Sequence, residues 1–180
     1  MRDTILRFFE ATNEGFLYRI YVTRIDILCV RMGRSQIPQP IGSTVGIAGA
    51  AGAQAAYEEK MGRFEREVEE EGQTLAKRGE DGVRTYIRAN DRGYEFDSEE
   101  LDEVRLDYAG KWKRLFFMSP TPALFLRDGK DKFIFLLPKK KDVVIALHEL
   151  ELLCGDNLEI NLRMDDYKKP LKKYAKMRDS

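Results

Sequence analysis

The stretch that decides the fold is residues 16–32, FLYRIYVTRIDILCVRM. Residues 16, 18, 20 and 22 are all apolar or aromatic, and they alternate with Leu17, Arg19 and Tyr21. This period of two is typical of a β-strand with one wholly apolar face. A short break over residues 23–26 precedes a second apolar run, residues 27–32, which Gly33 ends. The stretch therefore predicts a β-hairpin.

Downstream of this hairpin lies an uncharged run rich in glycine and alanine, Ile41–Ala56, IGSTVGIAGAAGAQAA. Pro38 and Pro40 prevent further regular strand pairing before it. Its small residues recur at steps of three and four, so a helix would carry them on one smooth face that another backbone can approach closely. The same spacing continues into a charged segment, and it predicts one helix from about Val45 to Lys77. Interior glycines each cost a helix about 1 kcal/mol, so we expect close packing to hold the first part in place.

We call the face with this spacing the seam and expect it to mediate packing or self-association. Its residues are Gly42, Gly46, Gly49, Ala53, Tyr57, Met61, Phe64 and Val68.

After Gly79 and Gly82 one or two helical turns are expected, and then the β pattern returns. Residues 5–9 favour a further strand upstream of the hairpin. Apolar residues spaced for one helical face follow Pro138, so a helix is predicted from there to about Cys154, ending before Gly155. The other predicted strands are Tyr94–Asp97, Val104–Tyr108, Leu115–Met118, Ala123–Arg127, Lys132–Leu137 and Leu158–Leu162. The order indicates an α+β fold in a single domain, 1–180, with a helical insertion at 42–90 and a basic tail at 165–180.

Counted from Phe16, this order of seven strands and one C-terminal helix resembles the pleckstrin-homology-like family, including its bacterial and GRAM-type members. The hairpin FLYRIYVTRIDILCVRMG is similar to the opening strands of that family, and YEFDSEELDEVRLDY to its acidic connection into a strand. The resemblance implies an antiparallel split β-barrel closed by a C-terminal amphipathic helix. Family members that bind phosphoinositides carry an Arg-x-Arg pattern near the first loop, and this hairpin has none, with Arg24 the loop's one basic residue.

Composition and motifs argue against several kinds of chemistry. The one histidine, His148, has no second histidine or suitable cysteine spacing to complete a triad or metal site, so we expect a structural role. Cys29 and Cys154 lie in apolar segments and are expected to be free thiols. The acidic groups at 67–71 and 99–103 fit solvated faces, and the glycine run lacks the Lys-Ser or Lys-Thr of a phosphate loop. We therefore expect a cytoplasmic protein that is not an enzyme and uses no cofactor, metal or nucleic acid.

Charge is distributed unevenly although the formal total is zero. Residues 1–56, 57–104 and 105–180 carry net charges of +2, −8 and +6. Such asymmetry orients partners or attracts one face of a molecule to another. The leading hypothesis is a non-enzymatic assembly module that binds a protein partner or a second copy through the seam. The alternative is a peripheral protein that contacts anionic lipid through Lys139, Lys140, Lys141, Lys168, Lys169, Lys172 and Lys173.

Overall fold

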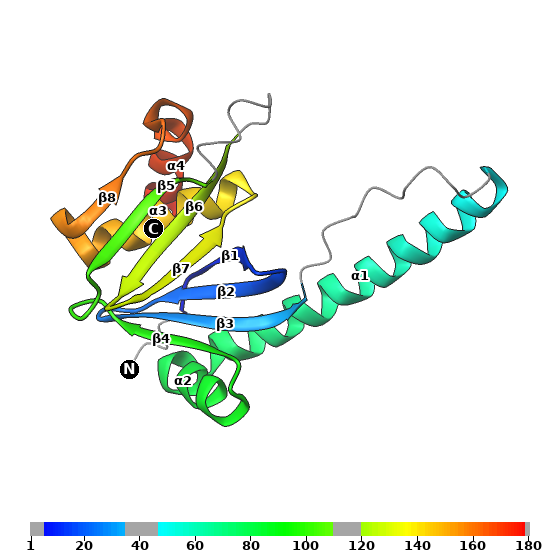
Figure 1. Cartoon of the computed structure of the whole chain (residues 1–180), viewed down its shortest axis with the longest axis horizontal. Helices are drawn as coiled ribbons and strands as arrows, with labels where there is room; N and C mark the ends of the chain where they lie inside the picture. Colours follow the sequence, from blue (N-terminus) through cyan, green and yellow to red (C-terminus); the bar gives the residue numbers. More distant parts are fainter. Residues whose placement is uncertain (1–5, 35–46, 110–119, 179–180) are drawn as a thin grey trace.

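The computed structural model describes residues 6–34, 47–109 and 120–178, and for residues 47–61 it describes the backbone alone. Within these ranges the chain forms one mixed sheet of eight strands, in the order β4-β3-β2-β1-β7-β6-β5-β8, together with four α-helices (Figure 1). The α+β class is therefore confirmed. The elements are β1 (Phe8–Asn13), β2 (Phe16–Val22), β3 (Asp26–Arg34), α1 (Ile47–Lys77), α2 (Gly79–Asn90), β4 (Gly93–Asp97), β5 (Glu103–Ala109), β6 (Thr121–Asp128), β7 (Asp131–Leu136), α3 (Lys140–Cys154), β8 (Leu158–Ile160) and α4 (Lys168–Arg178).

The predicted hairpin is β2 and β3, which pair antiparallel from Val22 and Ile27 outward. Thr23 holds its turn, because the Thr23 hydroxyl accepts a hydrogen bond from the Asp26 N–H. The strand upstream begins later than expected and continues to Asn13, where Glu14 and Gly15, both with positive φ, make the turn into β2. The insertion therefore follows a third strand, and the predicted strand at 115–118 lies outside the described residues.

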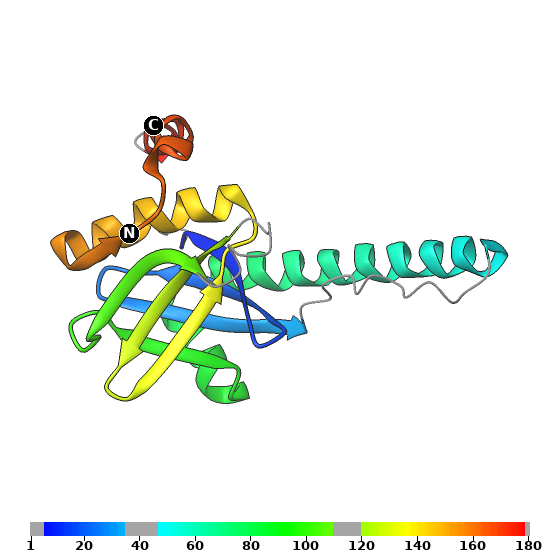
Figure 2. The ribbon, with the colours of Figure 1, turned by 45° about the horizontal axis from the view of Figure 1, so that its top comes forward.

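The sheet consists of two halves that meet weakly. β1–β4 form one half and β5–β8 the other, and the register between β1 and β7 contains a single pair, Thr12 with Leu136. Figure 2 shows the strands of one half crossing those of the other at an angle. The expectation of an antiparallel barrel is wrong for the described residues, because the sheet has free edges at β4 and β8 and because β8 pairs with β5 in parallel. The sheet is open because its edge strands, β4 and β8, do not pair with each other.

Two apolar cores lie on opposite faces of the first half-sheet. The residues of β2 with even numbers, Tyr18, Ile20 and Val22, enter the main core between the half-sheets and α3. Leu17 and Tyr21 enter a second core beneath α1 and α2. The period of two read from the sequence therefore assigns each side chain of this strand to its core.

The basic tail contains a helix, α4. Leu171 and Tyr174 of α4 pack against the main core, and the Tyr174 hydroxyl donates a hydrogen bond of 2.9 Å to the Glu149 carboxylate of α3. Pro170 lies in the first turn of α4, where a missing N–H leaves no helical hydrogen bond unmade.

Candidate functional site

The seam is divided by the structure into two parts with different surroundings. Gly42 and Gly46 lie outside the described residues, and Gly49, Ala53, Tyr57 and Met61 belong to the first half of α1. That half extends away from the sheet in both views, and no described segment lies beside it (Figures 1 and 2). The second half of α1 runs across the first half-sheet.

The second half of the seam packs within the chain. Val68 is buried in the second core, as is Leu75 further along α1, and Phe64 packs against it. Between them Gly72 lies against Arg19 of β2, so closely that a Cβ at Gly72 would overlap the guanidinium group. The Tyr21 hydroxyl also donates to the Gly72 carbonyl, at 3.4 Å. Here the absence of a side chain lets a helix backbone lie directly on a sheet.

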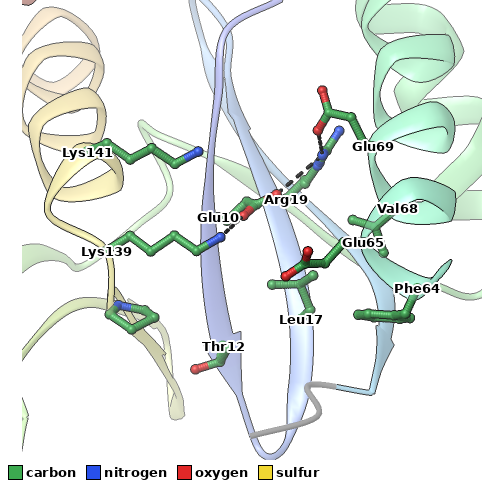
Figure 3. Close-up of a pocket in the computed structure, with 11 residues that line it drawn as sticks. Glu10, Thr12, Leu17, Arg19, Phe64, Glu65, Val68, Glu69, Lys139 and Lys141 are labelled. Carbon is green, nitrogen blue, oxygen red and sulfur yellow. Dashed lines mark hydrogen bonds and ion pairs between the residues drawn. The ribbon is translucent and has the colours of Figure 1, made fainter. Parts of the chain in front are cut away.

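A cleft of about 410 Å³ opens where α1, the strands β1 and β2, and the start of α3 converge. Its side chains come from all of these elements, as Figure 3 shows. The lining residues are Glu10, Thr12, Leu17, Arg19, Phe64, Glu65, Val68, Glu69, Pro138, Lys139 and Lys141. Two larger hollows lie elsewhere on the molecule, but this cleft alone among the three is lined by a fully buried cation, Arg19.

Arg19 is the centre of the cleft's charge network. Its side chain is 0% exposed, and its Nη2 donates to Glu10 at 3.3 Å and to Glu69 at 2.7 Å. The guanidinium group also lies 4.3 Å from the centre of the Phe8 ring, a cation–π distance. Its Nε and Nη1 have no hydrogen-bond partner among the described residues, and Nη1 is the atom nearest the Gly72 position.

The two carboxylates on Arg19 are held unequally. Burial alone raises the pKa of Glu10, but the hydrogen bond from Lys139, at 2.8 Å, and the charges of Lys139 and Arg19 bring that pKa below its usual value. The pKa of Glu69 is also lowered, first by the Gln73 amide and then by Arg19. Glu10 is 15% exposed and Glu69 is 54% exposed. Glu69 is thus the outer and more accessible of the two partners.

Asp142, in the first turn of α3, binds the backbone of β1 beside the cleft. Its Oδ1 accepts the Glu10 backbone N–H at 3.1 Å, an N–H on the side of β1 that faces β7. Oδ2 has no partner among the described residues, and burial raises the pKa of Asp142 above its ordinary value. The Asp142 carboxylate therefore accepts a hydrogen bond that the backbone of a neighbouring strand would accept in a continuous sheet.

The three adjacent lysines point to two different places. Lys139 and Lys141 line the cleft, whereas the Lys140 ammonium lies 5.7 Å from the centre of the Tyr167 ring, next to the start of α4. The five lysines of α4 lie at steps of one, three and four, which places them on one side of that helix, and all are exposed. They are Lys168, Lys169, Lys172, Lys173 and Lys176. We call this surface, with Lys140, the basic face.

The histidine and the two cysteines, which the sequence analysis considered for chemistry, lie outside the cleft. The His148 ring meets the Tyr174 ring edge-on at 5.2 Å and lies 3.3 Å from the Arg178 guanidinium. Both cysteines are free, and burial raises the pKa of the Cys29 thiol. No group of three potential metal ligands occurs in the part of the chain that the structure describes. No described helix is both long and apolar enough to cross a membrane.

Comparison with known proteins identifies no relative. No family model matches the chain, and neither a curated protein nor a solved structure does so.

The cleft was not predicted from the sequence, although all its residues are ordinary surface or strand types. One signal was available: Arg19 is the single charged residue in an otherwise apolar strand. A charge at such a position is stable only when it is paired, so it indicates partners somewhere in the fold.

Proposed function

We propose that this protein is a non-enzymatic assembly module in which the first half of α1 packs against the same helix of a second copy. The observation that carries the proposal is the direction of α1, whose first half extends away from the described body and begins with an uncharged, glycine- and alanine-rich run, residues 47–57 (Figures 1 and 2). Gly49 and Gly52 each cost this half about 1 kcal/mol relative to alanine. An isolated helix of such composition is marginal in water, and packing against another chain offsets the cost.

A second copy is the occupant we propose because the seam is self-complementary. Two identical faces of small residues can approach closely around a twofold axis, each receiving the other's backbone. Close approach of helix backbones gains many short van der Waals contacts, which a face of large side chains would prevent. The second half of α1 continues the helix into the body and fixes the direction of the first half, which we call the arm.

A matched pair of alanine substitutions tests the proposal. Ala53→Leu places a large side chain on the seam, whereas Ala51→Leu places the same side chain about 200° around the helix from Gly49, on the opposite face. Both substitutions keep a strong helix former. Light scattering should show a dimer or larger species for the wild type and for Ala51→Leu, and a shift toward monomer for Ala53→Leu. Equal masses for the two variants contradict the seam as the interface.

For the body of the molecule we propose a pleckstrin-homology-like architecture. The support is the order β1 to β7, seven consecutive antiparallel strands in groups of four and three, followed at once by α3. The open sheet and the parallel strand β8 are departures from that plan. We also propose a cytoplasmic location.

A second candidate function is attachment to anionic lipid through the basic face. Its support is that α4 packs on α3 through Leu171 and Tyr174 and turns its lysines to solvent. Each basic residue near an anionic surface contributes roughly 1 kcal/mol. Lys139 and Lys141 do not join this surface, because they line the cleft.

Vesicles that contain phosphatidylserine test this second function by co-sedimentation at low salt. Deleting residues 168–180 would expose the core beneath α4, so the informative variant is the triple change Lys169→Gln, Lys172→Gln and Lys173→Gln. The matched control changes the same three lysines to arginine. Binding by the wild type and the arginine variant, with loss in the glutamine variant, is expected. Absence of wild-type binding excludes the function.

A further inference from the structure

The cleft between α1, the strands β1 and β2, and the start of α3 has the features of a ligand site. We infer that it binds a carboxylate carried on a small apolar body, with the carboxylate taking the place of Glu69 on Arg19. The inference is independent of self-association, since the first half of α1 contributes no lining residue.

The first argument is that Arg19 has one partner that can be exchanged. Glu10 is 15% exposed and is bound by Lys139 as well as Arg19, so it is fixed in place. Glu69 is 54% exposed, and its other partner is Gln73 on the same helix. When the Glu69 side chain rotates to solvent, the Nη2 of a buried guanidinium becomes available to another carboxylate. A charge-assisted hydrogen bond from Nη2 to the incoming carboxylate then replaces the one that Glu69 makes.

The second argument is a second cation directed into the same space. The Lys141 ammonium points toward the gap between α3 and β1 (Figure 3). No ion pair of Lys141 is found among the described residues, whereas Lys139 is already bound to Glu10. Both Arg19 and Lys141 line the cleft, so the charges of both attract an anion that enters it.

The charge balance of the cleft favours a single negative charge. Three cations, Arg19, Lys139 and Lys141, face three carboxylates, Glu10, Glu65 and Glu69. When Glu69 turns away, the cleft loses one negative charge, while Asp142 beside it still acts on Lys139 and Lys141. A monoanion restores the balance, whereas a phosphate dianion adds repulsion from Glu10 and Glu65.

The lower wall of the cleft determines the rest of the ligand. Leu17, Phe64 and Val68 supply an apolar surface beside and below the charged groups (Figure 3). The volume, about 410 Å³, falls within the range of about 300–1,000 Å³ that is usual for small-molecule sites. A ligand with one acid group and a branched or aromatic body fits both halves of the cleft.

N-acetyl-leucine is a suitable probe, and N-acetyl-leucinamide is its uncharged match. Titration of the full chain, followed by NMR, should give saturable shifts at cleft residues with the acid. The amide and inorganic phosphate should each bind at least about fivefold more weakly. Equal binding of the acid and the amide overturns the inference, as does tighter binding of phosphate.

Two matched pairs of variants locate the site. Lys141→Met should weaken acid binding by about fivefold, whereas Lys140→Met, which alters the neighbour that faces Tyr167, should leave it unchanged. Glu69→Gln should tighten binding by a similar factor because the competing charge on Arg19 is removed. Glu70→Gln, an exposed neighbour, is its control. Thermal unfolding of each variant verifies folding. Equal effects within either pair overturn the inference.

A peptide of five residues that ends in leucine distinguishes the two sources of such a group. Tighter binding of the peptide with a free carboxylate than of N-acetyl-leucine identifies the C-terminus of a polypeptide. Equal or weaker binding of the peptide identifies a free small acid. Failure of both probes to saturate overturns the inference.

Discussion

Gly72 is the residue at which α1 comes closest to the sheet. Because a Cβ there overlaps the Arg19 guanidinium, Gly72→Ala should lower the free energy of unfolding by about 1–3 kcal/mol through overpacking. Gly62, on the same helix, has no neighbouring atom within 4 Å of a Cβ. Gly62→Ala should therefore raise the free energy of unfolding by about 0.5–1 kcal/mol. Urea denaturation measures both. Stabilisation by both substitutions would show that α1 does not lie against Arg19.

Asp142 is a buried carboxylate that serves as a hydrogen-bond acceptor. Asp142→Ala leaves the Glu10 N–H without its partner and should cost about 1–3 kcal/mol in the free energy of unfolding. Asp142→Asn keeps an oxygen at that place and removes a charge whose burial is unfavourable, so it should be at least as stable as the wild type at pH 7.

The pH dependence of Asp142 follows from the same burial. Because its pKa is raised in the folded chain, the folded state binds its proton more tightly than the unfolded state does. Its contribution to stability therefore falls as pH rises from the ordinary value near 4 to the raised value, and is constant above it. The advantage of Asp142→Asn over the wild type should grow across that window. An advantage independent of pH contradicts the assignment.

At the same scale, Arg19 illustrates what the sequence could and could not predict. Alternation along residues 16–22 correctly placed Arg19 with Leu17 and Tyr21 on one face of the strand. Its partner Glu69 is 50 residues away on a helix with several glutamates. Only the register of α1 on the sheet decides which glutamate reaches it, and that register depends on tertiary packing around Gly72.

Among the elements, those with strong periodicity were predicted well and those defined by their neighbours were not. The hairpin, the long helix α1 and the helix α3 follow patterns that burial on one face requires. The first strand was misplaced because Ala11, Thr12 and Asn13 resemble a turn, although they pair fully with β2. The helix α4 was not predicted, because lysines dominate its sequence and its apolar side is narrow. That side consists of Leu171 and Tyr174, which are buried only because the main core lies next to them.

The inserted helices belong to the folded core, which a pair of leucine substitutions can test. Leu75 of α1 is 1% exposed, so Leu75→Ala should lower the free energy of unfolding by about 2–5 kcal/mol. Leu152 of α3 is 61% exposed, and Leu152→Ala should change it by no more than about 0.5 kcal/mol. Calorimetry or denaturant titration measures both values. A small effect at Leu75 would mean that α1 is not docked on the sheet.

On the scale of the whole molecule, a two-sided half-sheet supports both candidate sites. Its inner face and α3 make the main core, and its outer face and the second half of α1 make the second core. The cleft opens where these layers meet, and the first half of α1 extends from the second core as an arm (Figure 1). The open edge at β8 and the angle between the half-sheets depend on pairings distant in sequence, which local patterns do not encode.

The measurement that tests the assembly role most directly is the molar mass of the wild-type chain by light scattering over a wide concentration range. We predict a mass of at least twice that of one chain, decreasing toward that of one chain on dilution. A mass equal to one chain at every concentration would contradict the pairing of two copies through the arm of α1.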